Sequence, residues 1–198
     1  MQDLDQLKED LRAILAHRVP ERVKVNGPDY TQASVLLPLF VKDGQYWLLF
    51  MRRTNTVEYH KGEVSFPGGV VDKNDDSLES TARRETFEEI GVREEDIEIL
   101  GQLDDIPTMT SRFIIHPFVG VVPFPYTFKI NKREVEHLIE VPLRFFLDPS
   151  QPQSFSIDYE GGIFETPAFM YKGAIIWGAT QRILENFINL IMGSGLDI

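Results

Sequence analysis

Three glutamates stand close together in one segment of the chain: Glu85, Glu88 and Glu89. At about 100° per residue, a helix through this segment places the three carboxylates within an arc of about 100°. Such carboxylates repel one another, whereas a bound cation makes the arrangement favourable. Mg²⁺ and similar hard cations take oxygen ligands and share carboxylates with substrate phosphates. The glutamates therefore indicate a divalent-metal site, although a solvated acidic helix face is the ordinary alternative.

The glutamates need a helix to align them and a loop to complete the site. The sequence predicts the helix over residues 77–90, with Gly91 at its C-terminus and with a side opposite the glutamates that packs on the core. The preceding loop contains Gly68 and Gly69, and glycine lets backbone approach a ligand closely. Strands are expected over residues 33–41, 46–51, 62–66, 97–103 and 114–122. Further helices are expected over residues 3–17, 134–140 and 175–191, the last beginning near Trp177 or Gly178.

The stretch over residues 69–92 resembles the Nudix box. In the order typical of that family it contains Gly69, Arg84, Glu85, Glu88, Glu89, Gly91 and the apolar Val92. A glycine pair or a glutamate-rich helix alone is a weak signal, and the combination is much more specific. The resemblance implies an α/β fold, namely a Nudix-type α/β/α sandwich with a mixed β-sheet and the catalytic loop-helix motif.

Two departures from the general box resemble the coenzyme A pyrophosphatase branch of the family. The interval between Gly69 and Arg84 is one residue longer, and its upstream acidic position is Asp75 rather than glutamate. The branch carries a spaced pair of aspartates, here Asp72 and Asp75, before Thr81 and the next residue, alanine. The box therefore points beyond the superfamily to one of its branches.

A second signature of this branch lies upstream of the box. Residues 49–54, Gly62 and residues 66–69 are similar to it in spacing, with Arg53 at its arginine position. At Glu58, however, the branch has a second basic residue that helps to hold an anionic substrate.

The resemblance implies a metal-dependent hydrolase in which water attacks a phosphorus of a nucleoside diphosphate linked to another group. Mg²⁺ or Mn²⁺ is the expected cofactor. Glu85 and Glu89 would be the primary metal ligands, and Gly69 would add its carbonyl. Glu88 would complete the site as a ligand or general base, and Arg84 would orient Glu88. Other candidates for the general base are Glu63, Asp104, Asp105 and Glu165.

The densest basic group of the chain lies just before the glycine loop. We expect it to contact substrate phosphate together with the loop backbone, although a solvated strand end is an equal alternative. The predicted substrate-binding residues are Arg52, Arg53, His60, Lys61, Gly68 and Gly69.

The expected substrate is coenzyme A or a derivative, cleaved to adenosine 3′,5′-bisphosphate and 4′-phosphopantetheine. A second hypothesis keeps the chemistry with ADP-ribose, a dinucleoside polyphosphate or a nucleoside triphosphate, and Glu58 favours it. A third is a non-catalytic nucleotide-binding module. The complete set of box glutamates argues against the third, because a binder does not need the whole metal apparatus.

Composition limits the remaining possibilities. The 198 residues predict one domain over 1–198, with an N-terminal helix and lead-in over 1–32. The net charge of −11 argues against nucleic-acid binding, and the absence of cysteine excludes disulfides and Cys-ligated zinc. No apolar run reaches the roughly 20 residues of a membrane span, so we expect a cytoplasmic protein without membrane association. A homodimer is left open. Phe87 and Trp177 are interpreted as core packing residues, and His116 as a packing or hydrogen-bonded residue.

Overall fold

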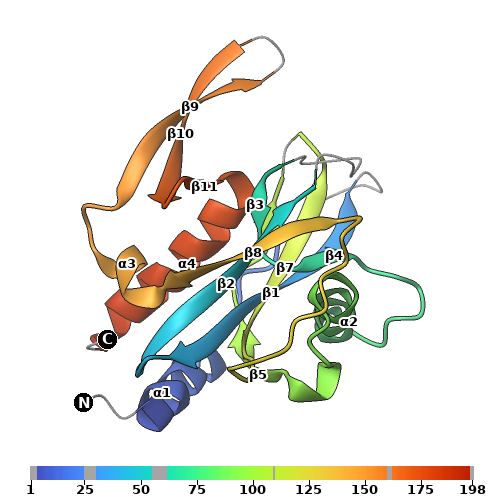
Figure 1. Cartoon of the computed structure of the whole chain (residues 1–198), viewed down its shortest axis with the longest axis vertical. Helices are drawn as coiled ribbons and strands as arrows, with labels where there is room; N and C mark the ends of the chain where they lie inside the picture. The colour runs from blue at the N-terminus through green and yellow to red at the C-terminus, as the bar shows by residue number, and fades with distance from the viewer. Residues whose placement is uncertain (1–3, 25–29, 55–61, 109, 160–161, 197–198) are drawn as a thin grey trace.

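The computed structural model describes residues 4–24, 30–54, 62–108, 110–159 and 162–196 (Figure 1). Its α-helices are α1 (Leu4–Ala16), α2 (Leu78–Ile90), α3 (Leu143–Leu147) and α4 (Gly178–Ser194), and η1 (Glu94–Asp96) is a short 3-10 helix. Its strands are β1 (Thr31–Lys42), β2 (Gln45–Arg53), β3 (Val64–Ser65), β4 (Gly68–Val70), β5 (Glu98–Gln102), β6 (Ile106–Pro107), β7 (Phe113–Val121), β8 (Val135–Pro142), β9 (Pro152–Tyr159), β10 (Gly162–Tyr171) and β11 (Ala174–Trp177).

A mixed sheet forms the centre of the molecule. Its main path is β3-β2-β1-β7-β5, and β4, β6 and β8 pair with β1, β7 and β2 respectively. β1 and β7 run parallel, whereas the other pairs are antiparallel. One edge of β2 pairs with β8. Its other edge pairs first with the C-terminal end of β1 and then, further along, with β3. The glycine loop consequently lies between β2 and β1, with β3 paired to the former and β4 to the latter.

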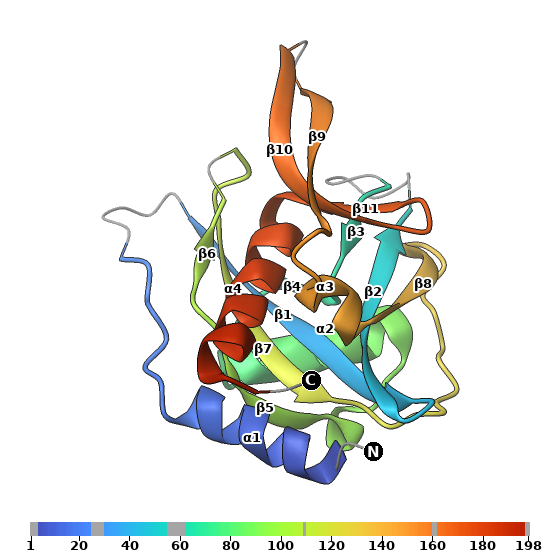
Figure 2. The same ribbon diagram turned by 90° about the vertical axis from the view of Figure 1, so that its left-hand side faces the viewer.

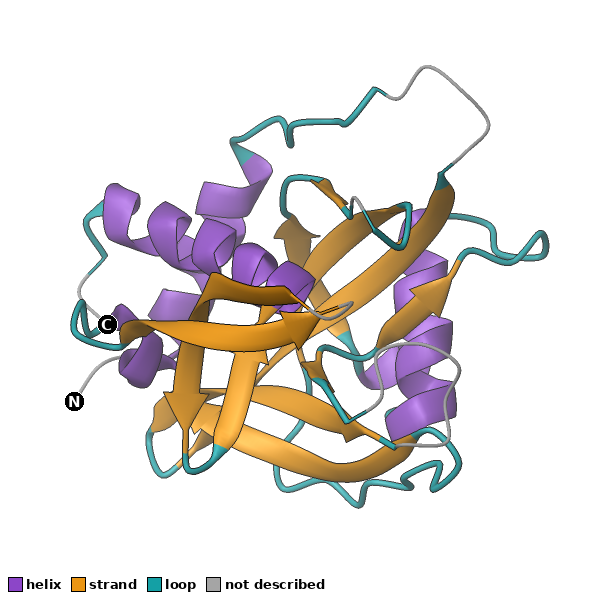
Figure 3. Ribbon diagram, turned by 90° about the horizontal axis from the view of Figure 1, so that it is seen from above, coloured by secondary structure: helices purple, strands orange, loops and turns teal. Residues whose placement is uncertain are grey.

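Helices cover both faces of this sheet. Strand residues point alternately to opposite faces. Leu37 and Leu39 of β1 pack in one apolar cluster that includes residues of α1 and α4, and Leu36 and Phe40 pack in another that includes residues of α2. Figure 3 shows the strands between these two groups of helices. The predicted α/β/α sandwich with a mixed sheet is confirmed.

Helix α2 begins and ends as the sequence predicted. The Ser77 hydroxyl accepts a bond from the Ser80 amide, and the Ser80 hydroxyl accepts one from the Ser77 amide, which forms a capping box. Gly91 ends the helix at φ 75°, a left-handed conformation that glycine adopts without strain.

The prediction of a helix over residues 134–140 is wrong. This segment is strand β8, which pairs with β2 from Trp47 opposite Pro142 to Arg53 opposite Val135. Local spacing favoured a helix, but the free edge of β2 supplies backbone partners that only an extended segment can use.

Strands β9 and β10 were not predicted. They form a three-stranded sheet with β11 and project from the body as a long hairpin (Figures 1 and 2). The predicted helix over 175–191 is confirmed from Gly178 onward, after the short strand β11. Among the described helices, none combines the length and apolar character needed to cross a membrane.

Candidate active site

Gly69 of β4 lies directly beneath the carboxylate of Glu85. β4 pairs with β1 so that Gly69 opposes Ser34, and α2 packs over this part of the sheet. A Cβ atom built on Gly69 would lie 2.5 Å from Cδ of Glu85 and 2.5 and 2.7 Å from its two carboxylate oxygens. A side chain at this position would displace the Glu85 carboxylate, so glycine permits the close approach of Glu85.

Glu89 is buried between the glycine loop and the end of β2. Its side chain is 2% exposed, and it accepts bonds from the Gly68 amide at 2.9 Å and from Nη1 of Arg53 at 3.4 Å. Burial raises the pKa of Glu89 to about 8, although the Gly68 amide and Arg53 oppose this shift. The charges of Glu85 and Glu134 raise the pKa further.

Arg84 connects the helix to the loop before it. It binds Asp75 with two bonds, Nε to Oδ1 at 2.8 Å and Nη2 to Oδ2 at 2.9 Å, and Glu85 at 2.6 Å. These bonds hold the pKa of Asp75 well below its usual range. The predicted contact with Glu88 is present at 3.4 Å, but the Glu88 side chain is 54% exposed. Arg84 therefore positions Glu85 more firmly than Glu88.

The expected packing side of α2 is confirmed in part, because Ala82, Thr86 and Ile90 are buried, but Glu89 is buried beside them instead of lying on the opposite side. Its buried residues include the small Thr81 and Ala82, which leave room for the carboxylates. Phe87 lies on the outer side and is 49% exposed, so its interpretation as a packing residue is wrong.

Glu134 is a fourth acidic residue near the pair, and it was not among the predicted site residues. It lies at the start of β8, where its carbonyl accepts a bond from the Thr54 amide at 2.9 Å. Its charge raises the pKa of both Glu85 and Glu89. Asn131 holds its carboxylate at 2.9 Å. No local pattern brings Glu134 to the box, because its placement depends on the pairing of β8 with β2.

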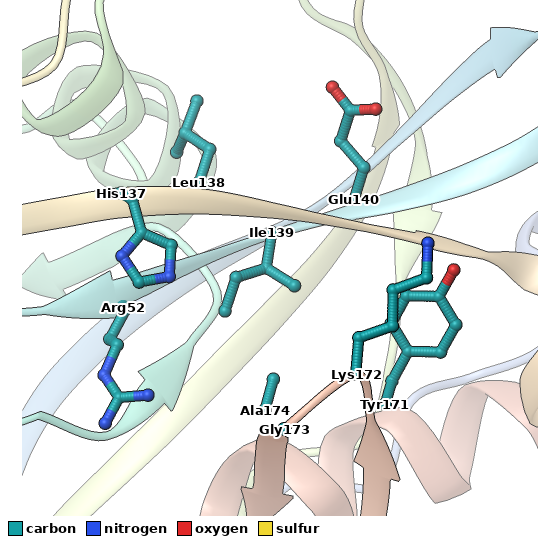
Figure 4. Close-up of a pocket in the computed structure, with 9 residues that line it drawn as sticks. All are labelled: Arg52, His137, Leu138, Ile139, Glu140, Tyr171, Lys172, Gly173 and Ala174. Carbon is teal, nitrogen blue, oxygen red and sulfur yellow. The ribbon is translucent and has the colours of Figure 1, made fainter.

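Arg53 and Arg52 lie on opposite faces of the sheet. Arg53 contacts Glu89 on the α2 face, whereas Arg52 pairs with Glu136 at 3.4 Å and lines a separate groove of about 280 Å³ (Figure 4). The groove is lined by Arg52, His137, Leu138, Ile139, Glu140, Tyr171, Lys172, Gly173 and Ala174. The structure thus brings Arg53, but not Arg52, to the carboxylates. His60 and Lys61 of the predicted basic group, and Glu58, lie outside the described residues.

Two of the alternative general bases hold the N-terminal lead-in. Asp104 pairs with Arg18, and Asp105 binds Arg22 at 2.9 Å. Asp105 also contacts Nδ1 of His116 at 2.7 Å, which confirms the interpretation of His116 as a buried, hydrogen-bonded residue. Both carboxylates therefore hold the N-terminal lead-in against the body of the protein.

The other two candidates also lie outside the box. Glu165 of β10 accepts a bond from the Ser156 hydroxyl at 2.5 Å in the projecting hairpin. Glu63 precedes β3, and its carbonyl accepts the Arg53 amide bond at 2.9 Å. Neither is among the charges that shift the pKa of Glu85 or Glu89.

The donors around Gly69 fit a hard divalent cation. Glu85 and Glu89 have side chains only 16% and 2% exposed, and burial raises the pKa of both. A cation would relieve the cost of ionising two neighbouring carboxylates in a poorly hydrated space. Among the described residues, no three acidic or histidine side chains form a ready metal site. The pair therefore fits Mg²⁺ or Mn²⁺ as a partial ligand set that water and substrate phosphate complete.

A helix with paired carboxylates over a glycine loop, on the face of an α/β/α sandwich, defines a phosphoanhydride hydrolase of the Nudix type. The NUDIX domain family matches residues 30–154. A Photorhabdus laumondii protein called Uncharacterized Nudix hydrolase NudL is 33% identical over 166 residues, which cover 84% of this chain and 86% of that protein. A Yersinia pestis protein of the same name is 36% identical over 155 residues, which cover 78% and 77% of the two chains. The chain belongs to the Nudix family.

Solved structures agree on the fold. The MutT/nudix family protein from Enterococcus faecalis has a TM-score of 0.52 and 17% sequence identity, with 98% of this chain and 75% of that chain covered. Family membership makes this protein a Nudix pyrophosphohydrolase, a class that acts on phosphoanhydrides and generally uses divalent metals.

Proposed function

We propose that this protein hydrolyses the pyrophosphate bond of coenzyme A or its derivatives, with Mg²⁺ or Mn²⁺ as cofactor. The observation that carries the proposal is the buried pair of carboxylates on α2. Glu85 lies against Gly69, and Glu89 accepts bonds from the Gly68 amide and from Arg53. This arrangement offers metal ligands and a phosphate-binding cation on one face.

Each residue of the pair has a defined task in this proposal. Glu85 and Glu89 would hold the cation, and Arg53 would neutralise charge on the substrate. When bound, the cation polarises the anhydride and lowers the pKa of water. Positioning and electrostatics supply most of the rate, and no covalent intermediate with the protein is needed. Glu88 is exposed enough to reach water, and Glu134 is the rival general base because its charge acts on both ligands.

The choice of coenzyme A rests on the branch-like features of the box. Asp75, whose type departs from the general pattern, binds both Arg84 and the Thr81 hydroxyl at 2.8 Å. The Asp72 amide in turn binds the Asp75 carboxylate at 2.8 Å. Asp75, Thr81 and Arg84 thus form one hydrogen-bonded unit that supports Glu85, whereas Asp72 joins it only through its backbone amide. Three of the residues that mark the branch therefore act together, which supports the branch-level proposal.

Two alternatives follow from the same site. A substrate with another group on the diphosphate, such as ADP-ribose, a dinucleoside polyphosphate or a nucleoside triphosphate, uses the same carboxylates and is favoured by Glu58. A nucleotide-binding module without activity is the second alternative. The buried Glu89 argues against this alternative. Burying a carboxylate lowers the stability of the fold, and a protein that only binds nucleotide does not need such a residue.

Product analysis by chromatography separates these possibilities. The wild-type protein is incubated with coenzyme A, ADP-ribose and a nucleoside triphosphate, each with Mg²⁺ or Mn²⁺. The proposal expects coenzyme A to be cleaved into its two phosphorylated halves, and Glu89→Gln to abolish cleavage. Glu79→Gln is the matched control, because Glu79 lies on the same helix but pairs with Arg83. Preference for another substrate would overturn the coenzyme A assignment, and cleavage of none would favour the binding module.

A further inference from the structure

Two buried polar atoms, one in Arg53 beside Glu89 and one in Ser65 of β3, have no hydrogen-bond partner. Within the described residues, Nε of Arg53 and Oγ of Ser65 are both buried and unpaired, although each residue is partly exposed as a whole. Buried polar groups in native proteins are almost always paired, because an unpaired one keeps its desolvation cost without compensation. Such atoms mark a place where a ligand or an ordered water completes the site.

The strand register places both side chains on the face that packs against α2. Met51 of β2 is directly opposite Ser65 of β3. The Arg53 amide, two residues after Met51, donates to the carbonyl of Glu63, which is two residues before Ser65. Met51 is fully buried in the cluster that includes residues of α2. Ser65 therefore faces α2, and Arg53 is its diagonal neighbour on the next strand, within reach of a long side chain.

The neighbours of Ser65 confirm this orientation. Val64 and Phe66 are both buried in the other cluster, on the α4 face. Arg52, which is opposite Val64, also points away from the carboxylates. Ser65 is thus the hydroxyl residue of β3 that reaches the Glu89 side of the sheet, three residues before Gly68.

We propose that the Ser65 hydroxyl is a substrate-positioning group that, with Nε of Arg53, donates hydrogen bonds to a phosphoryl oxygen of the substrate. Both atoms are hydrogen-bond donors, so an anionic acceptor oxygen satisfies both at once. This inference rests on the proposed function for the location of the phosphates, and it adds a residue that the metal-binding glutamates do not need. It also identifies the loop before Gly68 as a binding element.

The test begins with stability, because an unpaired hydroxyl and a paired one behave differently. Replacing Ser65 with alanine removes a group that has no partner, so the Tm of Ser65→Ala should equal or exceed that of the wild type. Ser34→Ala is the control, because the Ser34 hydroxyl is also buried but bonds to the His116 carbonyl at 3.0 Å. That variant should lose about 2–4 °C. A comparable loss in Ser65→Ala would overturn the proposal.

Equilibrium binding gives the second readout. The probe is the α,β-methylene analogue of ADP with Mg²⁺, measured by calorimetry, since its bridge cannot be hydrolysed. Ser65→Ala should raise its Kd about tenfold, as expected for one lost hydrogen bond to a charged group. Ser65→Thr should bind at least several-fold more tightly than Ser65→Val, because these two differ only in the hydroxyl. An unchanged Kd in Ser65→Ala, or equal binding by the Thr and Val variants, would overturn the role of Ser65.

The binding and turnover measurements distinguish failure of this inference from failure of the proposed activity. If the wild type binds the analogue but cleaves no substrate, and Ser65→Ala binds the analogue more weakly, the inference holds and the proposed activity is wrong. If the wild type cleaves coenzyme A and Ser65→Ala binds the analogue as well as the wild type, only the inference is wrong. A wild type that does not bind the analogue would overturn the inference as well.

Discussion

Gly69→Ala should abolish most of the activity without unfolding the protein. The added Cβ would lie 2.5 Å from the Glu85 carboxylate, whereas ordinary contacts begin at 3.4 Å. The carboxylate must therefore move by about 0.9 Å. Displacements of about 1 Å in a catalytic group cost on the order of 100-fold in rate. We expect kcat to fall by that factor, with a higher Mg²⁺ concentration at half-maximal rate, because Glu85 is a proposed ligand.

The neighbouring glycine gives a contrast that tests the reasoning. In Gly69→Ala the obstructed atoms are the end of a flexible side chain, so Tm should change little. In Gly68→Ala the new Cβ would meet the Ser34 carbonyl at 2.4 Å, and backbone cannot give way, so that variant should be strongly destabilised. Gly193→Ala, with nothing within 4 Å of the added atom, is the control for both. Steady-state kinetics and thermal melting suffice, and a Gly69→Ala variant with wild-type kcat and metal requirement would refute the assignment of Glu85.

Three further outcomes are expected. Asp75→Asn should lower the free energy of unfolding by about 2 kcal/mol at pH 7. Because Arg84 lowers the folded-state pKa of Asp75, the stability contributed by the Asp75 carboxylate is fully present above the unfolded-state pKa near 3.9 and is lost below it. In urea unfolding, the difference between wild type and variant should therefore shrink below about pH 4. Arg53→Ala should raise KM more than it lowers kcat, whereas Arg52→Ala should leave KM unchanged; equal effects on KM would contradict their placement on opposite faces. Asp105→Asn should lower Tm but keep the kcat of the folded protein, and a selective loss of kcat would restore Asp105 as a general base.

Local signals predicted the catalytic helix well. Its start depends on Ser77 and Ser80, its end depends on Gly91, and both effects act within a few residues. Helical periodicity likewise placed Glu85 and Glu89 on one side. The buried side was predicted in part: Ala82, Thr86 and Ile90 are buried as expected, but periodicity did not show that Glu89 is buried with them while Glu88 stays exposed.

Contacts between distant segments were beyond local patterns. Glu134 reaches the carboxylates only because β8 pairs with β2, and its segment was predicted as a helix. The separation of Arg52 from Arg53, by contrast, follows from strand alternation and was missed because the predicted strand ended at residue 51. Extending that strand by two residues would have placed the two arginines on opposite faces from sequence alone.

The two arginines nearest the carboxylates differ in what remains available for substrate. In Arg84, Nε and both terminal nitrogens donate to Asp75, Glu85, Glu88 or the Val70 carbonyl, so its charge is committed to holding the helix against the loop. In Arg53, Nε is buried and unpaired. An incoming phosphate would gain more from Arg53, because its bond there replaces an uncompensated desolvation cost and breaks no existing contact. Substrate should therefore approach from the β2 and β3 side of Glu89, where Ser65 lies.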